Sequence, residues 1–166
     1  MAGRSLPLWF LLLAPLVALA AYDANGVALG SPEREIRQRF PSAYCKALEW
    51  QSRAADRRCD DSRISFGGVE ARITFYLKKD QVEAFDVRFD TKEIERVIGF
   101  LKERYGKPVS EVRDTFEDKG KNTRQVYKLL WEAKGERAVL YAQLDKPRAS
   151  LLVSRGDFEE EIYRVR

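Results

Sequence analysis

Residues 70–89 read EARITFYLKKDQVEAFDVRF, and this stretch contains two runs in which apolar and polar residues alternate. Apolar residues occupy every second position of residues 71–77, and they do so again in residues 85–89. A period of two places the apolar side chains on one face of a β-strand. Lys79-Asp80 is a two-residue link typical of a tight hairpin. The stretch therefore predicts two antiparallel strands, each buried on one side only.

Similar short strands are expected along the rest of the chain, separated by turn signals such as Gly67-Gly68, Lys134-Gly135 and Lys146-Pro147. Because these turns are short, consecutive strands are expected to pair antiparallel. The last six residues are expected either to add a further strand or to remain a tail. The expected strands are residues 63–66, 111–116, 125–132, 137–144 and 149–154.

Two helices are expected to flank these strands. The first follows Ser31-Pro32, because serine is a good N-cap and proline suits the first helical position. Ile36 and Phe40 lie four residues apart on its apolar face, and Pro41 ends it after about two and a half turns.

The second helix is expected to begin at Asp90, with Glu93 completing a capping pattern. Gly106 and Pro108 follow its last turn and are typical of a helix end. Its apolar residues follow the helical period and form one continuous face: Ile94, Val97, Ile98, Leu101 and Tyr105.

The two halves of the chain carry similar patterns. Residues 36–41 (IRQRFP) align with residues 101–106 (LKERYG), and the strands that follow keep the same phase. We therefore predict an α+β fold of two repeats, residues 21–89 and 90–166, each a helix followed by about four antiparallel strands. The repeats are expected to form one compact domain, a mainly antiparallel sheet with the helices on one face, since each half alone would bury too little apolar surface.

The composition excludes several classes of function. The chain has 166 residues, with 30 Lys and Arg against 26 Asp and Glu, and it contains no histidine. The absence of histidine excludes Ser-His-Asp and Cys-His nucleophile systems and imidazole metal sites.

The charged residues alternate in sign along the sequence, whereas nucleic-acid binding needs a concentrated basic surface. The chain also lacks glycine-rich phosphate-binding motifs and a Gly-x-Ser-x-Gly motif. We expect a protein that is not an enzyme, binds no nucleic acid and carries no cofactor or metal ion.

Residues 1–20 are predicted to be a secretory signal peptide. Arg4 precedes an apolar run, and Ala18-Leu19-Ala20 is a small-x-small pattern that places cleavage after Ala20. The alternative is a retained membrane anchor, but its apolar run of about 16 residues is shorter than the roughly 20 that span a bilayer. The prediction is a periplasmic or secreted protein with no integral membrane segment after cleavage.

The two cysteines, Cys45 and Cys59, are predicted to form a disulfide, because an oxidising compartment favours pairing. The alternative is a reactive thiol, for which Lys46, Arg57 and Arg58 are the nearest cations in the sequence. The disulfide would close a loop of about 15 residues and contribute roughly 3 kcal/mol.

The face of the sheet that the helices leave uncovered is predicted to bind a protein partner. Aromatic side chains interleaved with charged ones are typical of such surfaces. The alternative is that tyrosine and threonine occur there only because they favour strands. The candidate partner-binding residues are Arg72, Thr74, Tyr76, Arg88, Val139, Tyr141 and Gln143, and Asp86 is expected on the same face.

Residues 26–31 (GVALGS), followed by Ile36, resemble the start of two related groups of exported proteins. One is the small lipoprotein of the outer-membrane β-barrel assembly machinery, and the other is the β-lactamase-inhibitor-like group of tandem αβ repeats. The resemblance to the second group covers the whole mature chain, and it implies a doubled fold with a sheet face that binds protein. The chain departs from the first group because it lacks a lipidated cysteine, and from the second because it has one cysteine pair.

Together these observations predict an exported, non-enzymatic protein that binds an unidentified envelope protein, as an assembly accessory or a hydrolase inhibitor. The alternative is a periplasmic glycan or small-ligand binding protein that uses Trp50, Tyr76 and Tyr141 as stacking platforms. The oligomeric state is not specified by the sequence.

Overall fold

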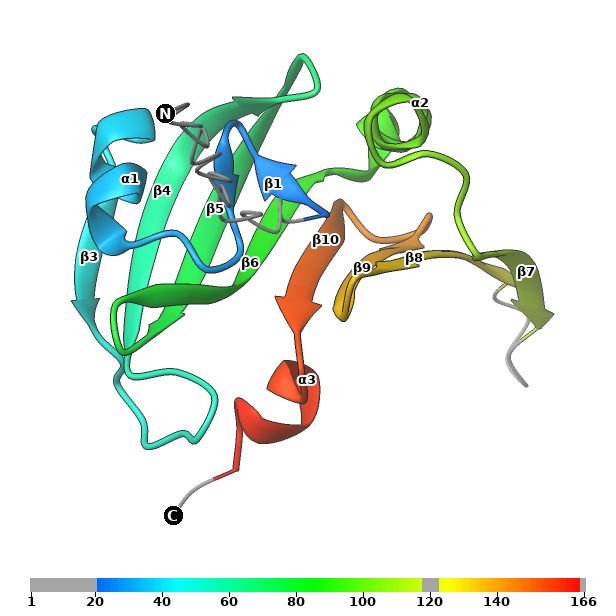
Figure 1. Cartoon of the computed structure of the whole chain (residues 1–166). Coiled ribbons are helices and arrows are strands. Elements are labelled where there is room, and N and C mark those ends of the chain that lie inside the picture. Colours follow the sequence, from blue (N-terminus) through cyan, green and yellow to red (C-terminus); the bar gives the residue numbers. More distant parts are fainter. Residues whose placement is uncertain (1–20, 118–122, 165–166) are drawn as a thin grey trace, which may run out of the picture.

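The computed structural model describes residues 21–117 and 123–164 (Figure 1). The predicted signal peptide, residues 1–20, lies outside the described residues. None of the helices in the described ranges has the length and apolar character that crossing a membrane requires.

Strands make up most of the described chain. A short hairpin pairs β1 (Asp23–Ala24) with β2 (Val27–Ala28). The remaining strands are β3 (Tyr44–Ala47), β4 (Arg57–Phe66), β5 (Val69–Lys78), β6 (Gln81–Asp90), β7 (Ser110–Glu117), β8 (Thr123–Ala133), β9 (Glu136–Gln143) and β10 (Arg148–Arg155). The helical elements of the described residues are α1 (Glu33–Arg39), the 3₁₀ turn η1 (Thr91–Glu93), α2 (Ile94–Tyr105) and α3 (Phe158–Glu161).

Strands β3 to β10 form one eight-stranded antiparallel sheet, in the order β3-β4-β5-β6-β10-β9-β8-β7. The predicted hairpin at residues 70–89 is confirmed as β5 and β6. Its link, Lys79-Asp80, has positive φ angles of 48° and 60°, as a type I′ turn requires. Strand β6 pairs with β10, so both halves of the chain contribute to a single continuous sheet.

The predicted α+β fold of two helix-plus-four-strand repeats is wrong. The structure is predominantly sheet, and the helices α1, α2 and α3 have only seven, twelve and four residues. The repeat prediction rested on aligning two apolar helix faces, but α1 buries only Ile36, whereas α2 buries a four-residue stripe. The alternation of period two is common to any half-buried strand and does not distinguish repeats.

The two faces of the sheet are covered differently, which also corrects the expectation of helices on one face. On the core face, α1, α2 and the β1–β2 hairpin cover a continuous apolar core that includes Phe75, Phe85 and Trp131. On the opposite face, here called the outer face, α3 packs against the ends of β5, β6 and β10 through Phe158. Of the last six residues, expected to be a strand or a tail, Glu161 ends α3, and residues 162–164 form neither a helix nor a strand.

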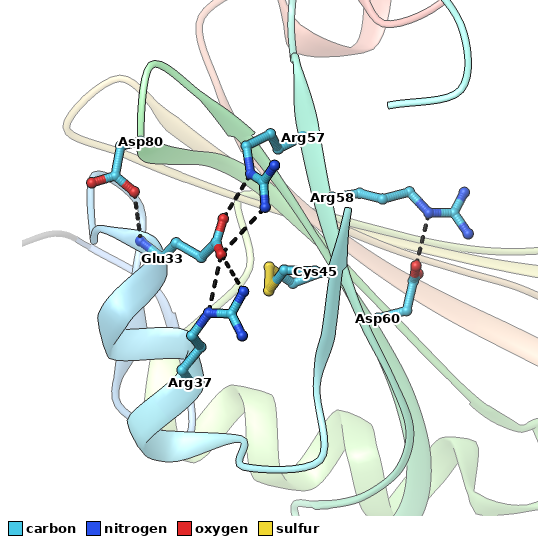
Figure 2. Close-up of a disulfide and its surroundings, with 8 residues drawn as sticks. Glu33, Arg37, Cys45, Arg57, Arg58, Asp60 and Asp80 are labelled. Carbon is cyan, nitrogen blue, oxygen red and sulfur yellow. Dashed lines mark hydrogen bonds and ion pairs between the residues drawn. A yellow bond between two sulfur atoms is a disulfide. The ribbon is translucent and has the colours of Figure 1, made fainter. Parts of the chain in front are cut away.

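Helix α1 is capped from a distant part of the chain. Ser31 was expected to be its N-cap, but the helix begins one residue later, after Pro32, and no side chain of its own caps it. The backbone N–H of Glu33 instead donates to Asp80 Oδ1 at 3.0 Å, from the β5–β6 turn (Figure 2). The turn therefore fixes where the helix starts.

The predicted disulfide is confirmed. Strand pairing places Cys45 of β3 directly opposite Cys59 of β4, and the two sulfur atoms are bonded (Figure 2). Beside it, Glu33 accepts hydrogen bonds from Arg57 on β4 and from Arg37 one helical turn later, with shortest N–O distances of 2.8 and 2.6 Å. The disulfide and this carboxylate together attach β3 and α1 to the sheet.

Candidate functional site

The outer face is formed by the alternate residues of the strands whose other residues fill the core. Strand register lines up its side chains in rows that run across the sheet. One row consists of Asp86, Leu152, Val139 and Leu130, and the neighbouring row consists of Arg88, Ser150, Tyr141 and Lys128. The first row thus runs from a charged residue on β6 to apolar residues on β10, β9 and β8, whereas in the second row Tyr141 lies between the polar Ser150 and Lys128.

The C-terminal segment forms a wall along one side of these rows. The Phe158 ring contacts the Tyr76 ring at a centroid distance of 5.3 Å. The indole N–H of Trp50 donates to the carbonyl oxygen of Ile162 at 2.8 Å, and the same indole stacks on Tyr163 at 6.2 Å. Trp50 therefore holds the end of the chain in place.

Between this wall and the sheet lies an open groove of about 330 Å³. Its floor comes from β5, β6, β9 and β10, and its wall comes from α3 and the residues that follow it. The lining residues are Tyr76, Asp86, Arg88, Val139, Tyr141, Ser150, Leu152, Phe158, Glu159, Ile162 and Tyr163.

An ion pair occupies one end of the groove. Arg88 Nε donates to Asp86 Oδ2 at 2.8 Å. The Asp86 side chain is only 12% exposed, and burial raises its pKa although Arg88 acts in the opposite direction. The Arg88 side chain remains 55% exposed. Ligand groups that enter the groove would meet a solvent-accessible guanidinium and a poorly solvated carboxylate.

Beyond the groove, the outer face stays open towards the β7 edge. Tyr141 is 41% exposed, and two apolar side chains of β7 on this face, Val112 and Phe116, are 40% and 55% exposed. All eight residues of β7 are exposed. This end of the sheet presents apolar side chains to solvent.

All seven residues predicted to bind a partner lie on the outer face, and four of them line the groove: Tyr76, Arg88, Val139 and Tyr141. The other three lie apart from it. Arg72 is opposite Arg88 in the strand pairing and lines a separate depression of about 460 Å³. The Thr74 hydroxyl donates to Asp60 Oδ1 at 2.7 Å, and Gln143 lies near the end of β9 opposite Val126.

Sequence reasoning missed the residues that form the wall and one residue of the floor. In the short segment after Gly156, Phe158 and Ile162 lie four residues apart, and this spacing is typical of one face of a helix. Leu152 pairs with Asp86 and therefore lies on the outer face, whereas the adjacent Val153 pairs with the core residue Phe85.

The three aromatic residues predicted to stack on a glycan, Trp50, Tyr76 and Tyr141, differ in how accessible their rings are. Trp50 is stacked on Tyr163, and Tyr76 is half-buried against Phe158. Burial also raises the pKa of the Tyr76 hydroxyl. Of the three predicted platforms, Tyr141 presents the exposed ring.

Within the described part of the chain, one group of side chains has the spacing of metal ligands: Glu33, Cys45 and Cys59. The two sulfur atoms form the disulfide and are therefore not thiolates. Arg57 and Arg37 already occupy the carboxylate of Glu33 and hold its pKa below the ordinary value. The chemistry of this group does not suit a metal ion.

No family model, curated protein or solved structure matches this chain.

Proposed function

We propose that this is an exported, non-enzymatic protein that binds another envelope protein through the outer face of its sheet. The observation that carries the proposal is the groove between α3 and the sheet, together with the exposed apolar residues of β7 farther along the same face. The disulfide fits an oxidising compartment outside the cytosol. The resemblance of residues 26–31 to two groups of exported proteins suggests the role: the protein either assists envelope assembly or inhibits a hydrolase.

The chemistry of the surface supports a protein partner. Its centre has Tyr141 beside Val139 and Leu152, and its margin has charged groups from β6 and α3. Protein interfaces combine an aromatic and aliphatic centre with a polar rim, and tyrosine is among the residues that contribute most binding energy. An exposed aromatic residue beside a groove is therefore the expected anchor.

The buried carboxylate in the groove gives independent support. The pKa of Asp86 is raised because burial removes water from the carboxylate and so disfavours its charged form. Such groups concentrate at functional sites, where a ligand or partner compensates for the lost hydration. A cationic group of the partner beside Asp86 would do so.

A second candidate, a glycan or small-ligand binding protein, is favoured by one observation. The groove places the Asp86–Arg88 pair near the exposed Tyr141 and Tyr163 rings. Sugar rings bind through stacking on aromatic side chains together with polar hydrogen bonds. The volume of about 330 Å³ is that of a small-ligand site.

The experiment is capture of partners from the envelope extract of the source organism by the exported, oxidised protein, at low and high salt. The protein that stays bound at high salt is purified, and its affinity is measured by calorimetry. We expect Tyr141→Ala to weaken binding by about tenfold or more. Tyr76→Ala is expected to weaken it as well, because Tyr76 supports α3.

The matched control is Tyr44→Ala. Tyr44 is a more exposed tyrosine, at 69%, and it also lies on the outer face, but on β3 at the edge of the sheet opposite to β7 and outside the groove. Its loss should leave affinity unchanged. Equal affinities for wild type, Tyr141→Ala and Tyr76→Ala would refute the proposal. An empty column, followed by binding in a glycan screen, would favour the second candidate.

A further inference from the structure

The first two described residues are held by one carboxylate. The backbone nitrogens of Ala21 and Tyr22 both donate to Glu136 Oε2, at 2.9 and 3.0 Å. Glu136 begins β9, more than a hundred residues further along the chain, and is half-buried. A long-range contact of this kind fixes the start of the folded chain at a defined place.

The residues after Ala21 are anchored as firmly. Tyr22 is 4% exposed, and its ring contacts the Tyr105 ring at 4.6 Å. The Tyr105 hydroxyl donates to the carbonyl oxygen of Asp23 at 2.9 Å, and Arg104 binds both carboxylate oxygens of Asp23 at 2.7 Å. The position of the Ala21 nitrogen is thus set by the core and by α2.

This nitrogen belongs to the bond at which the sequence predicts cleavage. Hydrolysis of the Ala20–Ala21 amide adds water across the bond, leaving a carboxylate on Ala20 and an amine on Ala21 that takes up a proton from solvent. A peptide N–H offers one donor without charge, whereas an ammonium offers three donors and a full positive charge. Charge-assisted hydrogen bonds are about twice as strong as neutral ones.

We propose that a signal peptidase hydrolyses the Ala20–Ala21 bond and that the new N-terminal ammonium of Ala21 forms an ion pair with Glu136, which completes the fold only after export. The proposal rests on the predicted export and is independent of what the outer face binds. Processing and the final stability of the protein are thereby coupled, because the unprocessed chain lacks the charge that Glu136 is placed to bind.

Arg155 on β10 lies opposite Glu136 in the strand pairing, and the charge of Glu136 acts on it. The hydrogen bonds of the Arg155 guanidinium to a carboxylate nevertheless go to Glu83, with N–O distances of 2.7 and 2.8 Å. Burial raises the pKa of the neighbouring Tyr22, and the charges of Glu136 and Glu132 raise it further. The charged and titratable groups on the elements packed around the new amine are Tyr22, Asp23, Arg104, Tyr105, Glu132, Glu136, Arg137 and Arg155.

The ion pair predicts a pH dependence with a definite sign. A neighbouring carboxylate raises the pKa of an α-ammonium above its ordinary value of about 7.7–8.0. The stabilisation is then fully present below that ordinary value and is lost as the pH rises through the pKa of the folded state.

The test begins with expression of the full 166-residue chain in an exporting host and an intact-mass measurement of the exported protein. We expect the mass of residues 21–166 with one disulfide. The folded protein is then acetylated at pH 8 with limiting acetic anhydride, and the rate at the α-amine is compared among wild type, Glu136→Gln and Glu132→Gln. We expect the α-amine to react about threefold faster or more in Glu136→Gln, because less of it is protonated.

Glu132→Gln is the matched control, because it makes the same change on the facing strand of the hairpin, at a carboxylate that pairs with Arg137. The charge of Glu132 acts on the neighbouring Tyr22, so the α-amine of this variant should react slightly faster than that of wild type but clearly more slowly than that of Glu136→Gln. If Glu136→Gln does not fold, the comparison is made between native and urea-unfolded wild type, and the native amine should be the slower. A different N-terminal residue, or an α-amine equally reactive in wild type and Glu136→Gln or in native and unfolded wild type, would overturn the proposal.

Discussion

The two faces of the eight-stranded sheet are built from alternate residues of the same strands, yet they are covered very differently. On the core face, α1, α2 and the β1–β2 hairpin exclude water from residues such as Phe75 and Leu140. On the outer face, α3 covers only one region, and Tyr141 remains exposed one residue away from Leu140. Adjacent residues of one strand therefore lie in two different environments, one inside the core and one exposed to solvent.

From this comparison we propose that the residues that determine stability and those that bind a partner are different in this protein. A substitution on the core face is expected to act on the free energy of unfolding, whereas one on the open part of the outer face is expected to act on affinity. The following predictions test that separation, beginning with the largest expected effect on stability.

The largest effect is expected from Phe75→Ala. Phe75 is fully buried and contacts the Phe40 and Phe85 rings at 5.1 and 6.0 Å. Removing a buried phenylalanine side chain leaves a cavity and lowers the free energy of unfolding by about 3–5 kcal/mol. Urea unfolding followed by circular dichroism measures it. A loss below about 1 kcal/mol would show that the core face is not the stabilising one.

The next largest effect is expected from removing the disulfide. Replacing Cys45 and Cys59 together by alanine frees the loop between them and should lower the free energy of unfolding by roughly 3 kcal/mol. Wild type unfolded in the presence of a thiol reductant should be equally destabilised. A reduced wild type as stable as the oxidised protein would contradict the contribution assigned to the crosslink.

Two carboxylates are expected to show pH effects of opposite sign. Hydrogen bonds from Arg57 and then Arg37 hold the pKa of Glu33 below its ordinary value. Its contribution is present above the ordinary value and is lost as the pH falls through the pKa of the folded state. Glu33→Gln should therefore destabilise by about 1–2 kcal/mol at neutral pH and match wild type in acid. A difference that did not depend on pH would refute this assignment.

Asp86 should behave in the opposite way. Because burial raises its pKa in the folded state, its ionisation reduces stability as the pH rises above the ordinary value. Asp86→Asn should thus be as stable as wild type in acid and up to about 1 kcal/mol more stable at neutral pH. A less stable Asp86→Asn at neutral pH would mean that the Arg88 ion pair outweighs the burial.

The smallest effect on stability is expected from Tyr141→Ala. Its ring is 41% exposed, so its removal should change the free energy of unfolding by no more than about 0.5–1 kcal/mol. The same urea titration used for Phe75→Ala gives the comparison. A loss as large as that of Phe75→Ala would mean that the outer face is part of the core.

Strands β5 and β6 and helix α2 could be predicted because each buries one face over most of its length. The alternation in β5 and β6 and the apolar stripe of α2 are long enough to define a period. The disulfide was predicted from two cysteines and from the predicted export of the chain. The arrangement of the predicted binding residues on one face followed from strand phase alone.

The short elements and the groove could not be predicted, for physical reasons. Strands β1, β2 and β3 have only two to four residues, and α3 has four, so none of them displays a period. Long-range contacts decide their structure, as when Asp80 caps α1 and Trp50 holds the residues after α3. The wall of the groove depends on these contacts, so the groove was not visible in the sequence.

The central claim is that a protein partner docks on the part of the outer face around the groove, and side-chain footprinting tests it within one molecule. Hydroxyl radicals oxidise exposed tyrosines, and mass spectrometry quantifies the oxidation at Tyr141 and at Tyr44 with and without the captured partner. We predict that the partner protects Tyr141 and leaves Tyr44, at the far edge of the sheet, as reactive as before. Protection of Tyr44 with no change at Tyr141 would contradict the account.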